Sequence, residues 1–427
     1  MSSGPATLET ESVRERDFRL LWIGSGISQL CGMATVVAFP LLAAQTLGAS
    51  VGQVGLITAA GYLPWLILTL PAGVYSARLP PRTMLLLADL GRALIVTIVP
   101  ILSATGHLAL WHLYLSNVLV SCATVFYEIV YLSMPPRMLP QDKLVYGNIR
   151  LQIARAVSLA FGPTLAGFTV QLVGPESAPL LNSAGFVASA SCNLLMRSHI
   201  ESARGSDRPS GLWAELGEAA RFIRGQPVML ASIAGSAVGN CCFAAYEALV
   251  VIFLAHDVGI APGTLGMLLG SVGIGGLIGA FSAGRVSRRL GTARAVWLPA
   301  AVLAPTGLLL PLTRAGSGLL LFLCGALLFH AGFSIFTVGQ ATLVQLLTPP
   351  QLLQRTVACV RFISRGMLFF GGLVGGGLGS LFGPRLGLTA VMLLWLTAPL
   401  ITASSHLRFW RDIPTRPVPA RDVSTLE

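Results

Sequence analysis

The chain has 427 residues, of which 54% are hydrophobic and only 11% are charged, and its formal net charge is +11. Soluble domains carry about 25% charged residues, so this composition excludes an ordinary soluble protein and indicates one embedded in a membrane. The basic residues gather at the edges of apolar segments, where membrane topology and anionic lipid account for them without nucleic acid. All seven cysteines lie inside apolar segments, so we expect no disulfide framework, no metal site and no cofactor.

Twelve apolar segments follow a polar N-terminal tail, residues 1–18, and precede a polar C-terminal tail, residues 408–427. Each is long enough to cross a hydrocarbon core, which needs about 20 residues of helix. They span residues 19–44, 52–76, 83–104, 109–133, 150–173, 178–198, 228–255, 264–284, 293–313, 318–342, 357–383 and 385–407. We therefore predict an all-α membrane protein of twelve transmembrane helices, in two six-helix halves at residues 19–198 and 228–407.

The basic residues are distributed unequally over the connectors between these segments. Of the 28 Lys and Arg, 26 lie in or toward the side that holds both tails and the even-numbered connectors; only Arg314 and Arg385 lie in connectors on the other side. Cytoplasmic loops are enriched in Lys and Arg, so we predict that both termini are cytoplasmic. The polar stretch 199–227 is then a cytoplasmic linker. Apolar residues recur there at helical spacing from Leu212 to Ile223, which predicts an amphipathic interfacial helix.

The two halves repeat a pattern of arginine and glycine. Segment five contains an Arg followed by two glycines, and segment eleven repeats these residues at the same spacing, 210 residues later: Arg155, Gly162, Gly167 and Arg365, Gly372, Gly377. Six-helix halves related as a parallel repeat are typical of a transporter architecture with its substrate site between the halves. Small residues let helices approach closely in lipid. The predicted helix-packing positions are Gly162, Pro163, Gly167, Gly372 and Gly377, and GxxxG steps in segments eight and eleven are predicted to join the halves.

Polar side chains recur along segment four at steps of three and four residues, which places them on one stripe of an otherwise apolar helix. They are Tyr114, Asn117, Ser121, Thr124, Glu128 and Tyr131. Lipid does not tolerate such a stripe. It therefore faces either a cavity, which we favour, or a neighbouring helix.

Three acidic residues lie well inside the apolar segments: Asp89, Glu128 and Glu247. A charge at the bilayer centre costs roughly 2.5–3.5 kcal/mol on insertion scales, so each is a candidate for carrying a proton. Glu247 is the first candidate and Glu128 the second. Asp89 lies three residues before Arg92, where an ion pair is the alternative. His330, near the middle of segment ten, is either a proton relay or a neutral hydrogen-bonding residue.

Six stretches together resemble the major facilitator superfamily, and within it the bacterial drug and siderophore exporters of the enterobactin-exporter type. They are FRLLWIGSGISQ at 18–29, PAGVYSARLPPR at 71–82, ADLGRA at 88–93, FYEIVYLSMPP at 126–136, RAVSLAFGPTLAG at 155–167 and GGLIGAFSAGRVSRR at 275–289. The resemblance implies a proton antiporter in which helices one, four, seven and ten line a central cavity.

The resemblance also implies roles for individual positions. The cavity helices carry polar and aromatic residues that become substrate-cavity candidates: Gln29, Asn117, Ser121, Thr124, Tyr127, Asn240, Tyr246, Phe333 and Ser334. The family's loop motif after helix two, with its repeat after helix eight, acts as a conformational gate, and it is matched by Gly73, Arg78, Arg82, Gly279 and Arg285. Ala77 stands where the family has an acidic residue, so the motif lacks the acid of the family's charge latch.

These features predict a monomeric, multi-pass secondary transporter of the bacterial inner (cytoplasmic) membrane. It would export a small amphipathic molecule, such as a drug, a siderophore or a specialised metabolite, in exchange for protons by alternating access, and so support antibiotic resistance or siderophore export. The resemblance alone sets the direction, so uptake, lipid flipping and a transport-inactive sensor stay open. An enzyme is not expected, because the chain has no HExxH or GxSxG motif and its sole lysine, Lys143, lies outside any phosphate-binding loop.

Overall fold

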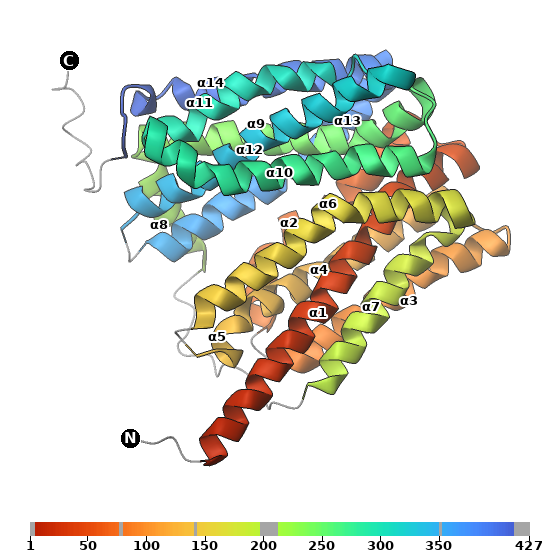
Figure 1. The fold of residues 1–427 in the computed structure, drawn as a ribbon, viewed down its shortest axis with the longest axis horizontal. Coiled ribbons are helices and arrows are strands. Elements are labelled where there is room, and N and C mark those ends of the chain that lie inside the picture. The colour runs from red at the N-terminus through yellow and green to blue at the C-terminus, as the bar shows by residue number, and fades with distance from the viewer. Residues whose placement is uncertain (1–4, 77–79, 141–142, 197–211, 350–351, 414–427) are drawn as a thin grey trace. The chain divides into compact units, whose positions relative to one another are not determined.

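The computed structural model describes residues 5–76, 80–140, 143–196, 212–349 and 352–413, and every regular element within them is a helix (Figure 1). Nine helical stretches among the described residues are long and apolar enough to cross a membrane. The structure therefore confirms an all-helical protein with many candidate spans. The count of twelve spans and the cytoplasmic location of both ends stay predictions.

The helices follow the predicted segments closely. Before the linker they are α1 (Pro5–Leu41, continued by a π-helical turn at Leu42–Thr46), α2 (Val51–Ser76), α3 (Pro81–Ala104), α4 (Leu110–Ser133), α5 (Pro135–Met138), α6 (Leu144–Ser177) and α7 (Pro179–Leu195). The predicted linker helix is α8 (Leu212–Arg224). After it come α9 (Pro227–Ile252, with a π-helical turn at Phe253–Asp257), α10 (Pro262–Leu290), α11 (Arg294–Leu303, continued as a 3₁₀ helix to Leu309), α12 (Leu319–Leu347), α13 (Leu353–Trp395) and α14 (Thr397–Ala403).

Two of these helices contain a sharp break at a Gly-Pro pair. Gly174 in α6 has φ 82° and Gly383 in α13 has φ 79°, values in the left-handed region that glycine adopts without steric cost. Pro175 and Pro384 follow directly, and proline is well suited to the first turn of a new helix because it needs no backbone donor there. Segments eleven and twelve therefore lie on the two sides of the break inside α13.

The chain divides into two compact units, each of which takes the beginning of one helix from the other half of the sequence. Unit one contains residues 1–50, 60–206 and 260–273, and unit two contains the remainder. The first turns of α2 thus belong to unit two, and the first turns of α10 belong to unit one. The predicted division at 199–227 did not include this exchange of helix ends.

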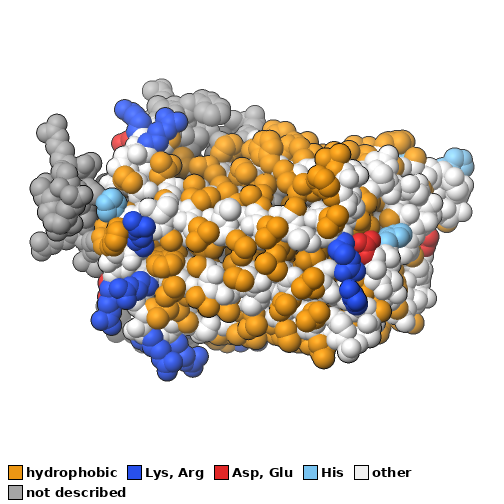
Figure 2. All heavy atoms as spheres, turned by 90° about the horizontal axis from the view of Figure 1, so that it is seen from above, with side chains coloured by type: hydrophobic (Ala, Val, Ile, Leu, Met, Phe, Trp, Pro, Cys, Tyr) orange, Lys and Arg blue, Asp and Glu red, His pale blue; other side chains and the backbone are white. Residues whose placement is uncertain are grey.

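Within unit one, α1 packs along α6 and α7, and α3 packs against α4 and α7 (Figure 1). A buried cluster that includes Phe18, Leu21, Leu85 and Met134 fills the space among them. Within unit two, α9 packs along α13 and against α14, and α11 packs against α12. Burial of these apolar side chains leaves the remaining apolar surface outward, as expected for a protein solvated by lipid. Figure 2 shows hydrophobic side chains across one face, with Lys and Arg at its margins.

Glycines set the closest helix crossings in both units. In unit one a Cβ on Gly266 of α10 would collide with the carbonyl oxygen of Pro163 in α6 and would lie 3.0 Å from the Cα of Gly167. In unit two a Cβ on Gly372 of α13 would lie 2.6 Å from the backbone nitrogen of Ala59 in α2. Two helices can approach so closely only where the residue at the crossing is a glycine.

Two further glycines were predicted to pack helices together. Gly162 lies against Met33 of α1, which agrees with that prediction. Gly377 does not, because no described atom lies within 4 Å of a Cβ placed there. The repeat in segment eleven therefore matches segment five in sequence at this position without sharing its packing environment.

Candidate functional site

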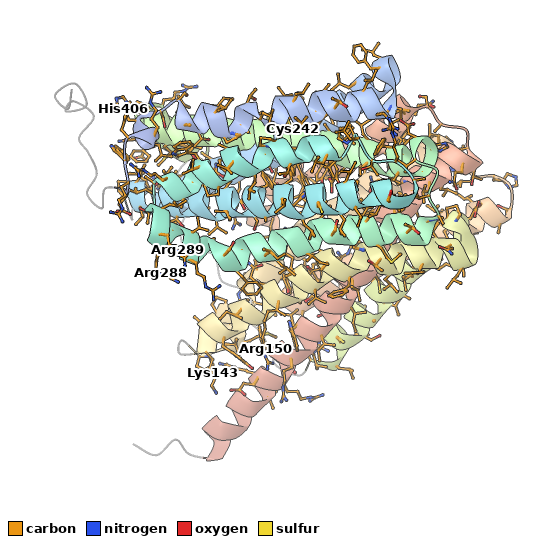
Figure 3. All side chains as sticks on the ribbon, turned by 45° about the horizontal axis from the view of Figure 1, so that its top comes forward. Lys143, Arg150, Cys242, Arg288, Arg289 and His406 are labelled. Carbon is orange, nitrogen blue, oxygen red and sulfur yellow. The ribbon has the colours of Figure 1, made fainter. Side chains whose placement is uncertain are left out.

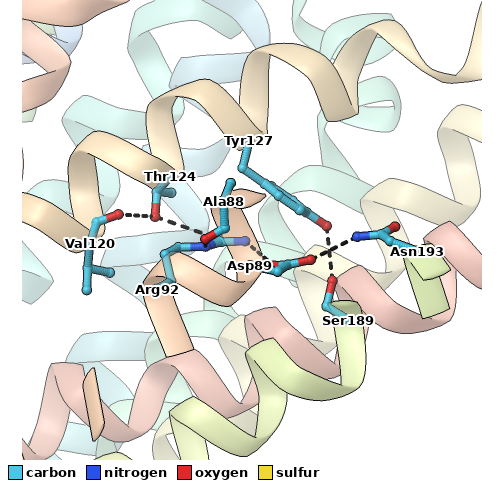
Figure 4. Close-up of polar contacts among 8 residues, drawn as sticks. All are labelled: Ala88, Asp89, Arg92, Val120, Thr124, Tyr127, Ser189 and Asn193. Atoms are coloured by element: carbon cyan, nitrogen blue, oxygen red, sulfur yellow. Dashed lines mark hydrogen bonds and ion pairs between the residues drawn. The ribbon is translucent and has the colours of Figure 1, made fainter. Parts of the chain in front are cut away.

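A buried ion pair within α3 is joined to α7 by a hydrogen bond in unit one (Figure 4). The carboxylate of Asp89 is fully buried and pairs with Arg92, which is 4% exposed, one helical turn later. The side-chain amide of Asn193 donates a 2.8 Å hydrogen bond to the second carboxylate oxygen. The predicted ion-pair alternative for Asp89 is therefore present, and both of its oxygens are engaged.

Two aromatic rings contact the guanidinium of Arg92. Its central carbon lies 4.2 Å from the ring centroid of Tyr127 in α4 and 4.4 Å from that of Phe186 in α7. Such cation–π contacts are strongest where water is excluded. The Tyr127 hydroxyl lies 3.4 Å from the Oγ of Ser189. Tyr127 therefore positions Arg92 in this structure, in contrast to the substrate-cavity position predicted for it.

Parts of the polar stripe on α4 contact neighbouring helices. A Cβ on Gly61 of α2 would lie 2.8 Å from the side-chain amide of Asn117. The Thr124 hydroxyl donates to the Val120 carbonyl at 2.8 Å and lies at the limit of hydrogen bonding from Arg92, at 3.5 Å. At Asn117 and Thr124 the stripe therefore lies against neighbouring helices, which was the alternative to a cavity. Cavity roles for Ser121 and Glu128 stay predictions.

The cytoplasm-facing end of the stripe, in the predicted orientation, meets α1. The Oγ of Ser25 donates to the Tyr131 hydroxyl at 3.0 Å, and Gln29 also hydrogen-bonds to Tyr131. Tyr131 of α4 therefore meets polar side chains of α1.

An apolar cavity lies among α9, α11, α12 and the end of α13 in unit two. It is small, about 20 Å³, and it is lined by Gly239, Ala300, Ala304, Phe329, Phe333, Phe336, Trp395, Ala398 and Pro399. Trp395 meets Phe329 and Phe333 edge-on, with ring centroids 4.6 and 5.2 Å apart. Of these rings only Phe333 was predicted. The spacing of four and three residues from Phe329 to Phe336 marks one helix face and could have indicated the others.

A second feature of unit two adjoins this cavity. The rings of Tyr246 in α9 and His330 in α12 have centroids 5.7 Å apart, and both side chains are buried. The hydroxyl of Tyr246 and the Nε2 of His330 find no hydrogen-bond partner among the described residues. The other ring nitrogen of His330 lies 3.0 Å from the Ala326 carbonyl oxygen. An unsatisfied buried polar atom costs about 1–3 kcal/mol, so a polar group or a water between the two rings would be stabilised.

The remaining candidates of unit two lie on the same helices. Glu247 follows Tyr246 directly in α9. The side-chain amide of Asn240 donates to the Ser236 carbonyl at 2.8 Å, within α9. Ser334 packs against α10, because a Cβ on Gly279 would lie 2.8 Å from the Cβ of Ser334. Gly279, predicted as a gate residue, is thus a close-packing position between α10 and α12.

The predicted gate motif after α2 lies only partly within the described residues. Gly73 lies in α2, whereas Ala77 and Arg78 lie outside the described residues. Arg82 donates to the carbonyl oxygens of Asn193 and Leu194, at 3.0 and 2.6 Å. These are among the last carbonyls of α7, where a cation complements the helix dipole. Arg285, in the repeat after α10, is exposed.

The described residues contain no group of three or more His, Cys, Asp or Glu side chains that could hold a metal ion. The candidate sites therefore consist of aromatic rings, carboxylates and one buried imidazole. They offer no cluster for metal-assisted chemistry in the part of the chain that the structure describes.

Known proteins similar to this chain are transporters. Over 387 residues it is 23% identical to the uncharacterized MFS-type transporter YfiS of Bacillus subtilis (strain 168), covering 88% of this chain and 90% of YfiS. Over 277 residues it is 26% identical to the multidrug efflux pump Tap of Mycolicibacterium fortuitum, covering 63% of this chain and 66% of Tap.

Solved structures share the fold at low identity. A crystal structure of a mutant of the nucleoside transporter NupG matches with TM-score 0.75 and 13% identity, over 92% of this chain and 98% of that one. An inward-facing bacterial homologue of the iron transporter ferroportin matches with TM-score 0.69 and 17% identity, over 93% of this chain and 98% of that one.

Residues 10–425 match the family model described as transmembrane secretion effector. The chain therefore belongs to the transmembrane secretion effector family of major facilitator superfamily transporters.

Proposed function

We propose that this transporter resides in the bacterial inner membrane and exports small amphipathic molecules with an aromatic or lipophilic part, in exchange for protons. The observation that carries the proposal is the contact between the aromatic cavity and the buried polar pair in unit two. Phe329 lines the cavity, and its ring centroid lies 5.1 Å from that of His330. The aromatic side chains of the cavity and a titratable group therefore occupy neighbouring positions on one helix.

The proton is assigned to Glu247, with Glu128 as the second carboxylate. Both lie within apolar helices, where an ionisable side chain is expensive and marks a functional position. Glu247 is adjacent in α9 to Tyr246, whose ring lies 5.7 Å from that of His330. Loading a proton on Glu247 would thus alter the charge beside the same pair of rings that adjoins the cavity.

Export is supported by the similarity to the efflux pump Tap. The fold alone does not favour export. The solved structures that share it include the nucleoside transporter NupG and a bacterial homologue of the iron transporter ferroportin. Uptake or lipid flipping by the same fold is the alternative.

Proton movement in inside-out vesicles tests the proposal. Vesicles with and without the protein are loaded with an acid-inside gradient, lipophilic dyes and drugs are added, and a pH-sensitive dye reports proton efflux. We expect substrate-triggered proton efflux only when the protein is present. In Glu247→Gln it should disappear while substrate binding is kept. Glu218→Gln is the matched control, because Glu218 is 50% exposed and pairs with Arg355 outside the proposed site. Unchanged proton efflux in both Glu247→Gln and Glu128→Gln would contradict the proposal.

A further inference from the structure

One face of α10 changes from apolar to basic along its length. Ile274, Ile278, Phe281, Arg285 and Arg288 follow one another at steps of four and three residues, so they lie on one stripe of the helix. The apolar members are exposed, Ile278 by 53% and Phe281 by 74%, and both arginines are exposed too. On a membrane-spanning helix such a stripe meets acyl chains along its apolar part and reaches the headgroup layer where the arginines begin.

The C-terminal segment brings another arginine to the same end of α10. The backbone nitrogen of Ala293 donates to the Arg411 carbonyl at 3.0 Å. The nitrogen of Thr292 donates to the Asp412 carboxylate at 2.8 Å, and Ile413 returns a bond to the Thr292 hydroxyl at 2.8 Å. These bonds hold Arg411 against the turn between α10 and α11.

Gly291 is the point of contact in that turn. Its φ of 92° suits glycine, and a Cβ there would lie 2.6 Å from the Cγ of Arg411. The turn thus accepts the Arg411 stem only because residue 291 has no side chain. Figure 3 shows Arg288 and Arg289 at this end of α10, with His406 of the C-terminal segment at the same end of the unit.

Five exposed arginines therefore gather from three stretches of chain: Arg285, Arg288, Arg289, Arg294 and Arg411. We call them the arginine corner. None of them forms an ion pair with another described residue. The sequence offers one acid within 285–294 and 405–413, Asp412, and its carboxylate already accepts from Thr292. The corner thus carries five positive charges against the single carboxylate of Asp412, and it keeps a net positive charge.

We propose that the arginine corner binds the headgroup of an anionic phospholipid whose acyl chain lies along Ile274, Ile278 and Phe281. Arginine pairs with phosphate through two parallel hydrogen bonds, and basic clusters at the cytoplasmic surface recognise anionic lipid. A free phosphate ion would pair with the arginines but would leave the apolar stripe uncovered. The exposed apolar stripe that leads into them fits only a ligand with a chain attached. This inference is independent of the transported substrate and of proton coupling.

The test is lipid retention by the purified full chain, measured by native mass spectrometry during titration with phosphatidylglycerol or with phosphatidylcholine of identical acyl chains. We expect the wild type to retain phosphatidylglycerol about tenfold better. In the triple variant Arg285→Gln, Arg288→Gln, Arg411→Gln this preference should fall to about twofold or less. The triple variant Arg14→Gln, Arg314→Gln, Arg361→Gln removes the same charge from exposed positions elsewhere and should keep it.

Two further arms identify the occupant. Ile278→Ser with Phe281→Ser leaves every arginine in place and should weaken phosphatidylglycerol retention severalfold. Inorganic phosphate at millimolar concentration should not displace the lipid. Thermal melting of each variant in detergent checks that it is folded, and a variant that melts early is replaced by its single substitutions. Equal retention of the two lipids, equal loss in the control triple variant, or displacement by phosphate would overturn the proposal.

Discussion

Trp395 meets Phe329 edge-on, with ring centroids 4.6 Å apart and ring planes at 85°. The two residues are 66 positions apart in the sequence and come from different helices. Phe329 also meets His330 edge-on, at 5.1 Å. A single phenyl ring therefore separates the Trp395 wall of the cavity from the buried imidazole, so a change in the cavity is expected to be felt at His330.

Filling the cavity should impair handling of aromatic substrates. Ala300 is buried and lines the cavity, so Ala300→Leu would place three extra carbons in it. We expect the initial rate of lipophilic dye export from vesicles to fall about tenfold, in keeping with the discrimination that small changes in an apolar pocket produce. Val302→Leu on the neighbouring exposed surface is the control, since Val302 is 63% exposed. If both variants export dye at the wild-type rate, the cavity takes no part in transport.

Breaking the buried ion pair should destabilise unit one. Asp89→Asn leaves Arg92 buried without its counter-charge, and removal of one partner of such a pair costs about 3–5 kcal/mol. Replacement of both residues by apolar ones, Asp89→Leu with Arg92→Met, should recover much of this loss. Denaturant unfolding of the purified protein measures each value.

The exposed ion pair between Glu15 and Lys143 supplies the comparison for this prediction. Its side chains are 38% and 43% exposed, and such pairs contribute about 0–1 kcal/mol. Glu15→Gln should therefore leave the unfolding free energy nearly unchanged. A loss for Asp89→Asn no larger than that for Glu15→Gln would mean that Asp89 is not held as a charged partner of Arg92, and it would return Asp89 to the proton-carrying candidates.

The sequence revealed features that depend on local spacing. Asp89 and Arg92 lie one helical turn apart, so their pairing follows from helix geometry. Nine helical stretches of the described residues are long and apolar enough to span a membrane, because length and composition alone favour a helix in lipid. The boundary between the segments 357–383 and 385–407 coincides with the break at Gly383, where a Gly-Pro pair interrupts the helix.

Features that depend on distant parts of the chain were missed. The aromatic cavity needs Trp395 beside Phe329, and no spacing rule joins residues on α12 and α13. The stripe on α4 was assigned to a cavity because periodicity identifies a face without saying what covers it; Asn117 turned out to lie against α2. The contact of Tyr127 with Arg92 was not foreseen for the same reason, since Arg92 comes from another helix.

Arg82 should stabilise the end of α7. Its guanidinium donates to two carbonyl oxygens, those of Asn193 and Leu194, whereas an ammonium cannot reproduce this planar pair of donors. Arg82→Lys is expected to cost about 0.5–1.5 kcal/mol of unfolding free energy, the net value of one hydrogen bond. Arg14→Lys, at an exposed position, is the control. Equal stability of the two variants would indicate that Arg82 serves only the charge of the predicted gate.

A methyl group at the crossing of α6 and α10 should destabilise unit one. Gly266→Ala would bring a Cβ into the Pro163 carbonyl and close to Gly167. Neither partner is the end of a flexible side chain, so the helices themselves must separate. Overpacking of this kind costs about 1–3 kcal/mol. The matched control on the same helix is Gly276→Ala, because no described atom lies within 4 Å of a Cβ at Gly276.

Thermal melting in detergent separates the two glycine variants. Gly276→Ala should melt at the wild-type temperature or slightly above it, since alanine favours the helix by up to about 1 kcal/mol, whereas Gly266→Ala should melt several degrees lower. Gly167→Ala should resemble Gly266→Ala. The double variant should lose less than the sum of the two, because one separation of α6 from α10 accommodates both methyl groups. Strict additivity would show that the two glycines do not share one crossing.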